Sequence, residues 1–144
     1  MLALTPDEAV VWRELRRIAE RRETVSYSDL MDRLRDHVEV DLGTTYRTPL
    51  YAMLGHVSTY EKSRGRPLLS AIVVRAGAHD PGPGFFNLAR QLGFEWEDDR
   101  QFFEEQRDMV WTLWSAKDSV ELLDATLTPL LDRLERLERL LRRR

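Results

Sequence analysis

The chain has 144 residues, a net charge of −3, three histidines and no cysteine, with 42% hydrophobic and 33% charged residues. This is one domain's length, enough to bury a core without disulfides, and the composition excludes a disordered chain. No apolar run approaches 18 residues, so we expect no membrane span. The first residues lack a basic start, an apolar stretch and a cleavage site, which together with the lack of cysteine predicts a cytoplasmic protein.

Charge is distributed unevenly along the chain. Residues 42–79 carry five Lys or Arg and one acid, whereas residues 80–127 carry four Lys or Arg and eleven acids. Residues 128–144 carry six Arg and three acids. Binding to a polyanion needs clustered Lys and Arg, so 42–79 is the internal segment where a nucleic-acid surface can form. The acidic segment 80–127 is the candidate surface for a protein partner.

Two capping boxes predict the first two helices. Thr5 and Glu8 form the first box, and Pro6 occupies the first helical position between them. Ser26 and Asp29 repeat the pattern before the second helix. The apolar stripes that follow at helical spacing are Val11, Leu15 and Ile18 in the first helix and Leu30, Met31 and Leu34 in the second.

A third helix is predicted from Thr48-Pro49 to near Gly65, a natural left-handed cap, after a loop over 38–45. Its apolar stripe is Leu50, Met53, Leu54 and Val57. The run Leu68–Val74 is continuously apolar and rich in branched side chains, which predicts a buried strand. Because one strand is not stable alone, we expect it to pair with Thr24-Val25 or with its own copy in a dimer.

The rest of the chain is predicted to be helical again. A turn-rich loop over 77–84 precedes a short helix over 85–92 that Gly93 closes. We interpret the Pro-Gly-Pro-Gly end of this loop as a rigid turn that lets two phenylalanines enter the core, and the alternative is a helix start that binds an anion. Asp98 or Asp99 caps a longer helix. The order of elements predicts an α+β, mainly helical fold, with a winged-helix-like core and a small sheet in a globular domain over 1–117.

Two stretches resemble known proteins. Residues 25–30, VSYSDL, resemble the opening of the second helix in many winged-helix domains and in alkyltransferase-like proteins. The alkyltransferase-like proteins continue with a Pro-(Cys or Trp)-His-Arg motif that this sequence lacks, so their activity is not implied. Segments 65–74, 81–86 and 89–90 are similar to a group of small bacterial and phage proteins that share a strand, Pro-Gly-x-Gly-Phe and an aromatic helix. That resemblance, over roughly 26–114, implies a winged-helix-like core and no catalytic residues.

The third helix and its exit hold the candidate nucleic-acid-binding residues. In a winged helix this element is the recognition helix and the entry to the wing, where cations meet phosphates and aromatic side chains reach bases or sugars. The alternative is a solvated helix end whose basic residues favour the C-terminal dipole. The candidates are Tyr51, Tyr60, Lys62, Arg64 and Arg66, with His56 between them.

Residues that would support catalysis are sparse. Neither GxxxxGK[ST] nor GxGxxG occurs, so no nucleotide-binding loop is predicted. His79-Asp80 is a common pair of metal ligands, but His37 and His56 do not complete it at a suitable spacing. We therefore predict no catalytic residue, no metal site and no cofactor.

Leucines near the C-terminus alternate at spacings of four and three, which is a heptad seam interrupted at Pro129. The seam consists of Leu123, Leu127, Leu130, Leu134, Leu137 and Leu141. It predicts a homodimerising helix within 118–144. The alternative is a terminal helix that folds back on its own core.

These features together favour a dimeric, non-catalytic binding module, with a DNA-binding regulator as the leading interpretation. The alternative is a protein-interaction or adaptor subunit that uses the acidic segment 80–127 and binds no nucleic acid. An enzyme of unknown substrate is a third class, which no group of residues supports.

Overall fold

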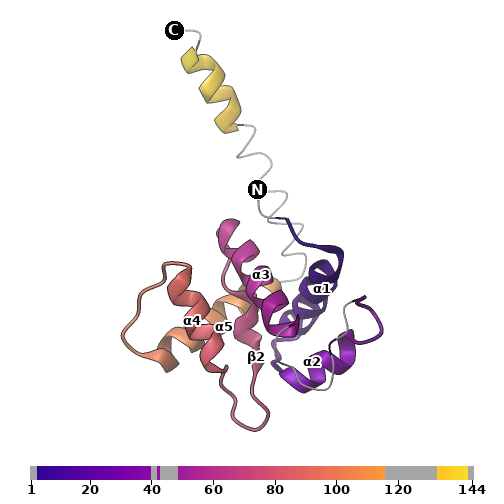
Figure 1. The fold of residues 1–144 in the computed structure, drawn as a ribbon. Helices are drawn as coiled ribbons and strands as arrows, with labels where there is room; N and C mark the ends of the chain where they lie inside the picture. The colour runs from indigo at the N-terminus through magenta and orange to yellow at the C-terminus, as the bar shows by residue number, and fades with distance from the viewer. Residues whose placement is uncertain (1–2, 40–41, 43–48, 116–132, 143–144) are drawn as a thin grey trace.

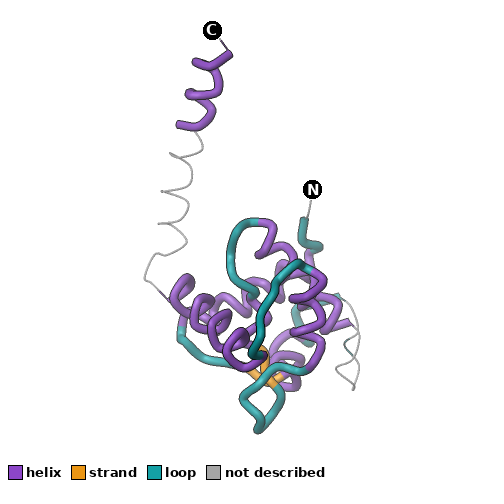
Figure 2. The backbone as a smooth tube through the Cα atoms, turned by 90° about the vertical axis from the view of Figure 1, so that its left-hand side faces the viewer, coloured by secondary structure: helices purple, strands orange, loops and turns teal. Residues whose placement is uncertain are grey.

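The computed structural model describes residues 3–39, 42, 49–115 and 133–142. The described chain is mainly helical with one small sheet, which confirms the predicted α+β, mainly helical class (Figure 1, Figure 2). In chain order the elements are α1 (Pro6–Glu20), β1 (Val25–Ser26), α2 (Tyr27–Leu34), α3 (Pro49–Ser63), the 3-10 turn η1 (Leu69–Ile72), β2 (Val73–Val74), α4 (Pro83–Gln91) and α5 (Asp99–Ser115).

The predicted caps set the helix ends. Thr5 Oγ1 accepts the Glu8 N–H at 3.2 Å while Glu8 Oε1 accepts the Thr5 N–H at 2.9 Å, which confirms the first capping box. Ser26 Oγ accepts the Asp29 N–H at 3.2 Å at the start of α2. Gly65 has a φ of +73°, and beyond it the chain turns back on the end of α3. Local sequence chemistry therefore determines where most of these helices begin and end.

The two strands form a parallel pair within one chain. Val25 lies opposite Val73 and Ser26 opposite Val74. Of the two expected partners, the intrachain one is confirmed. The pair joins the segment before α2 to the segment after α3, so it closes the first half of the fold into one unit.

The predicted strand Leu68–Val74 is wrong over most of its length. Leu69–Ile72 form η1, and only Val73 and Val74 are strand. All seven residues are buried because the segment runs between two apolar clusters. Leu69, Ile72 and Val73 belong to one cluster, and Leu68, Ala71 and Val74 belong to the other. A segment buried on every side is mostly apolar whatever its backbone, so the pattern does not separate a strand from a 3-10 turn.

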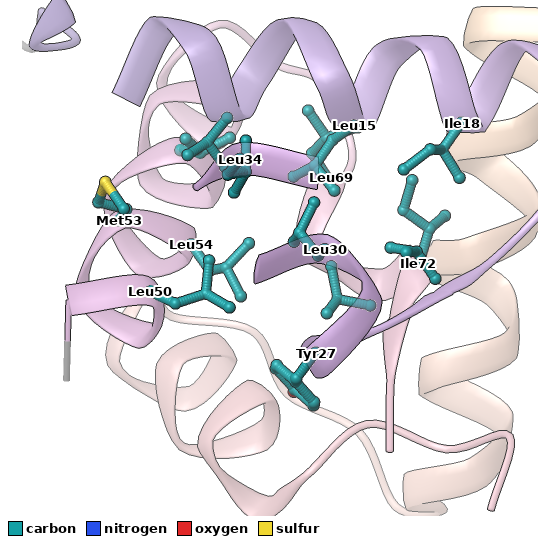
Figure 3. Close-up of a cluster of buried hydrophobic side chains, with 14 of the residues drawn as sticks. Leu15, Ile18, Tyr27, Leu30, Leu34, Leu50, Met53, Leu54, Leu69 and Ile72 are labelled. Atoms are coloured by element: carbon teal, nitrogen blue, oxygen red, sulfur yellow. The ribbon is translucent and has the colours of Figure 1, made fainter. Parts of the chain in front are cut away.

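The first cluster lies between α1, α2, α3 and η1. Figure 3 shows Leu15 of α1 above Leu30 of α2 and Ile18 of α1 beside Ile72, with side chains of α3 on the other side of Leu30. The second cluster packs α4 and the start of α5 against residues 68–74, which we call the central segment. In this cluster Phe85 and Phe103 are in edge-to-face contact at 6.0 Å between ring centroids. The central segment and α5 thus join both clusters into one core.

Polar groups of the central segment are paired inside the core, whereas the indole Nε1 of the buried Trp114 has no hydrogen-bond partner among the described residues. The amide side chain of Gln106 on α5 accepts the Leu68 N–H at 3.0 Å, and Ser58 Oγ accepts the Ser70 N–H at 3.0 Å. The two serine hydroxyls lie 2.7 Å apart. These contacts satisfy backbone groups that the irregular central segment would otherwise leave without partners in the core.

The C-terminal helical segment, residues 133–142, exposes every residue. The predicted boundary between residues 117 and 118 lies outside the described residues. None of the helices in the described ranges combines the length and the apolar character that a membrane crossing requires.

Glu8 links α1 to α3. Its side chain is nearly buried, and its Oε2 lies 2.5 Å from His56 Nδ1. Burial opposes the charged form, but the Thr5 backbone N–H and the His56 side chain outweigh it and hold the pKa of Glu8 below its ordinary value of 4.5. The carboxylate is therefore more readily ionised in the folded chain than in the unfolded chain.

We expect Glu8→Gln to lower the free energy of unfolding at pH 7 by about 1 kcal/mol. A lowered pKa gives stability that is present above the unfolded pKa and is lost as pH falls through the folded pKa. The deficit of the variant should therefore shrink as pH falls below about 4.5. Urea denaturation at several pH values measures the difference in unfolding free energy between the variant and the wild type. The control is Glu95→Gln, a substitution at an exposed loop residue. A deficit that stays constant down to about pH 3 would contradict the assignment.

Candidate nucleic-acid interface

The C-terminal end of α3 is built around a buried carboxylate. Glu61 is fully buried. Its oxygens accept hydrogen bonds from Trp12 Nε1 at 2.6 Å, from Arg66 Nε at 2.7 Å and from Arg66 Nη2 at 3.0 Å. The left-handed turn at Gly65 reverses the chain, and the Arg66 N–H bonds the Glu61 carbonyl at 2.9 Å, which brings the guanidinium back to the carboxylate.

Arg66 stays charged in this position. Burial disfavours its charged form, but the hydrogen bonds and the opposite charge of Glu61, followed by Tyr60, raise the pKa of Arg66 above its ordinary value. The Glu61 carboxylate and the Arg66 guanidinium neutralise each other's charge. Removing either partner alone would leave the other one in a low-dielectric environment, which is costly.

Aromatic rings and a second arginine surround the pair. Trp12 meets Tyr60 and Trp114 edge to face, at 6.4 and 6.1 Å between ring centroids. The Arg16 guanidinium lies over the Trp12 ring at 4.4 Å and over the Trp114 ring at 4.7 Å. Arg66 lies 5.7 Å from the rings of both Tyr60 and Trp114. Each cation–ring contact adds stability, so α1, α3 and α5 are held together at this point.

Two cations face solvent at the C-terminal end of α3 and the turn that follows it, residues 60–66, which we call the exit of α3. Lys62 and Arg64 are both exposed, with the Lys62 ammonium 5.2 Å from the Phe94 ring and the Arg64 guanidinium 5.2 Å from the Tyr60 ring. The side chain of Arg66 is only 20% exposed and is held by Glu61. Of the three predicted cations, two are therefore available to a ligand, and the third holds the chain in place.

Tyr51 lies away from the other candidates. It is nine residues before Tyr60, and at about 100° per residue the two side chains leave α3 on opposite sides. Tyr51 packs on Tyr27 of α2 at 5.1 Å between ring centroids. The structure therefore brings Tyr60, Lys62, Arg64 and Arg66 together at the end of α3 and places Tyr51 on another face.

Sequence reasoning missed the importance of Glu61. The signal was present: Leu50, Leu54, Val57 and Glu61 follow one another at spacings of four, three and four, so they share one helical face. Three of them form an apolar stripe, and the fourth is the only acid in segment 42–79. A single acid on a buried stripe indicates a paired carboxylate in the core.

In the other polar candidate, His79-Asp80, the aspartate has a structural role. Asp80 Oδ1 accepts hydrogen bonds from Arg75 Nη2 at 2.8 Å and Nε at 3.0 Å, which closes the loop between β2 and α4. Among the residues that the structure describes, no group of three or more His, Cys, Asp or Glu side chains is placed to hold a metal ion.

Comparison with known proteins found no matching family model, no matching curated protein and no matching solved structure. The resemblance to small bacterial and phage proteins stays a hypothesis.

We expect Arg66→Met to lower the free energy of unfolding by about 3–5 kcal/mol, because it leaves the fully buried Glu61 charge without its partner. Adding Glu61→Gln should restore part of this loss, since the amide keeps the shape and removes the charge. Urea denaturation of the two single variants and the double variant gives the coupling energy. A double variant as unstable as the sum of both single changes would contradict a buried ion pair.

Proposed function

We propose that this chain is a dimeric DNA-binding module that contacts the phosphate backbone through the exit of α3. The observation that carries the proposal is the burial of Glu61 against Arg66. Segment 42–79 has five basic residues and this one acid. With the acid neutralised inside the core, Lys62 and Arg64 are exposed cations without an ion-pair partner among the described residues, and binding to phosphates requires such cations.

The winged-helix interpretation is part of this proposal. Helix α1, strand β1, helices α2 and α3 and strand β2 follow one another in the order that it expects. Two features differ from it: the strands are parallel, and α2 ends at Leu34 while α3 begins only at Pro49, whereas about three or four residues separate the helices of a helix-turn-helix. We therefore propose contacts to phosphates rather than base reading by α3.

The number of available cations sets the expected salt dependence. Each protomer offers Lys62 and Arg64, so a dimer neutralises about four phosphates. The logarithm of affinity should then fall with the logarithm of salt concentration with a slope of about −3.6.

We expect Lys62→Glu combined with Arg64→Glu to abolish binding to a random duplex at about 50 mM salt without unfolding the protein, because both side chains are exposed. The matched control is Arg90→Glu combined with Arg100→Glu, which makes the same change in net charge on α4 and α5. A mobility-shift titration at two salt concentrations measures both variants. Wild-type protein that binds no duplex at about 50 mM salt, or an equal loss in the control, would reject the proposal.

The dimeric part of the proposal rests on residues 133–142. Leu134, Leu137 and Leu141 of the predicted seam are 56%, 50% and 69% exposed. Leu123, Leu127 and Leu130 lie outside the described residues. Leucines that the chain's own core does not cover favour pairing with a second copy over folding back.

The charges beside the seam favour a parallel pair. The leucine spacing assigns Leu134 to position a and Leu137 to position d of a heptad, which places Arg133 at g and Glu138 at e. In a parallel dimer, a g residue faces the e residue of the following heptad on the other chain. Arg133 and Glu138 then attract one another across the interface.

We expect Leu134→Glu combined with Leu137→Glu to convert the dimer to a monomer, because carboxylates would replace the apolar seam. Arg136→Glu, which lies off the seam, should leave the dimer intact. Sedimentation equilibrium at about 50 µM measures the mass of each protein, a concentration at which a micromolar dimer is largely formed. A wild-type protein that sediments as a monomer would contradict the proposal.

The second candidate function is a protein-binding subunit. Its support is a run of exposed acids in and after the loop that joins α4 to α5, formed by Glu95, Glu97, Asp98 and Asp99. Such a run suits a basic partner. Wild-type protein that binds no duplex DNA would make this candidate the leading one. For either function we propose a cytoplasmic location, which the lack of cysteine fits.

A further inference from the structure

A pocket of about 380 Å³ opens between α2, α3 and α4, on the Tyr51 side of α3. Three aromatic rings line it, those of Tyr27, Tyr51 and Phe85, together with the amide side chains of Asn87 and Gln91. This size falls within the range of small-molecule sites, and apolar walls with a few polar groups are typical of them.

The walls of the pocket are uncharged. One third of the chain is charged, yet none of the described residues that line the pocket is Asp, Glu, Lys or Arg. Burial raises the pKa of Tyr27 to about 12, so its hydroxyl is neutral at physiological pH. An ion that entered such a site would lose water without gaining an opposite charge, so the pocket favours neutral molecules.

Gly55 keeps the pocket open. It lies in the interior of α3, where glycine costs stability relative to alanine. The backbone does not require it, since Gly55 is not among the residues with a positive φ. Close packing does not require it either, because a Cβ there would lie 3.9 Å from Leu88 Cδ1, an ordinary contact. What glycine provides at this position is open space in the wall of the pocket.

The two carboxamide side chains of the pocket residues lie on one wall, whereas Tyr27, Tyr51 and Ser70 bring hydroxyl groups from other elements. Asn87 and Gln91 are four residues apart on α4, so their amides lie on the same helical face. Both are exposed, and each can donate and accept a hydrogen bond. A carboxamide group on a ligand has a complementary hydrogen-bond donor and acceptor.

We propose that this pocket binds an uncharged, flat aromatic molecule that carries a carboxamide-like group. The ring packs against the aromatic walls, and the carboxamide bonds the amides of Asn87 and Gln91. The site is independent of the proposed DNA interface, because it lies on the opposite side of α3 from Tyr60. The DNA proposal and this one can therefore fail separately.

The test uses three probes of the same shape and different charge: benzamide, benzoate and benzylammonium. In ¹H–¹⁵N spectra of the full chain, benzamide should shift the Gly55, Gly84 and Asn87 signals and the side-chain amide signals of Gln91 saturably. For so small a probe we expect a Kd of about 10 mM. Benzoate and benzylammonium should bind at least about tenfold more weakly, because their charge finds no partner in the pocket.

Two substitutions of Gly55 test whether benzamide binds in this pocket. Gly55→Leu should weaken benzamide binding by about tenfold or more by filling the space. Gly55→Ala should raise the melting temperature, because alanine favours the helix, and should weaken binding several-fold. A more stable protein that binds less well excludes misfolding as the cause. Ser63→Leu, at the exposed end of α3, is the control and should bind as the wild type does.

Three results would overturn the proposal. They are no saturable shift at about 50 mM benzamide, equal binding of the three probes, and unchanged binding in both Gly55 variants.

Discussion

The buried carboxylate of Glu61 is the contact on which the rest of the structure depends. It ties Trp12 of α1 to α3 and holds Arg66 at the start of the central segment. Because a fully buried charge is tolerated only with its partners in place, the position of each of these three elements is linked to the others. The same contact removes the one acid of the basic segment from the surface. A single ion pair thus both links these elements and leaves Lys62 and Arg64 as the exposed cations at this end of α3.

After Arg66 the chain continues into the central segment, residues 68–74. This segment divides its side chains between the two apolar clusters, and α5 packs along both. Its irregular backbone is stabilised by Gln106 and Ser58 from neighbouring helices. One end of α3 therefore carries the basic exit, while its other side forms the wall of the neutral pocket with α4.

Much of the fold could be predicted from local chemistry. The capping box at Thr5 and the left-handed turn at Gly65 depend on residues within a few positions, and such signals are visible in one sequence. The η1 segment could not be predicted in this way, because burial on all sides erases the periodicity that separates backbone types. The pairing of Trp12 with Glu61 joins residues 49 positions apart in the chain, so only the packing of α1 on α3 reveals it.

Only part of the candidate site could be predicted from the sequence, because packing determines which side chains reach solvent. Charge clustering located the exit of α3, but helical geometry separates Tyr51 from Tyr60 and burial withdraws Arg66. Counting charges along a segment does not show which of them reach solvent. The neutral pocket had no sequence signal beyond a glycine inside a helix, since its lining comes from elements far apart in the chain.

The central claim is that DNA meets the protein at the exit of α3. The chain has no cysteine, so one cysteine can be placed at a chosen exposed residue and given a photo-crosslinker. Ser63→Cys, between Lys62 and Arg64, should crosslink to a duplex at about 50 mM salt and lose this crosslink at about 300 mM. Thr112→Cys, exposed on α5, should crosslink weakly at both salt concentrations. Equal crosslinking from both positions, or stronger crosslinking from Thr112→Cys, would contradict the account.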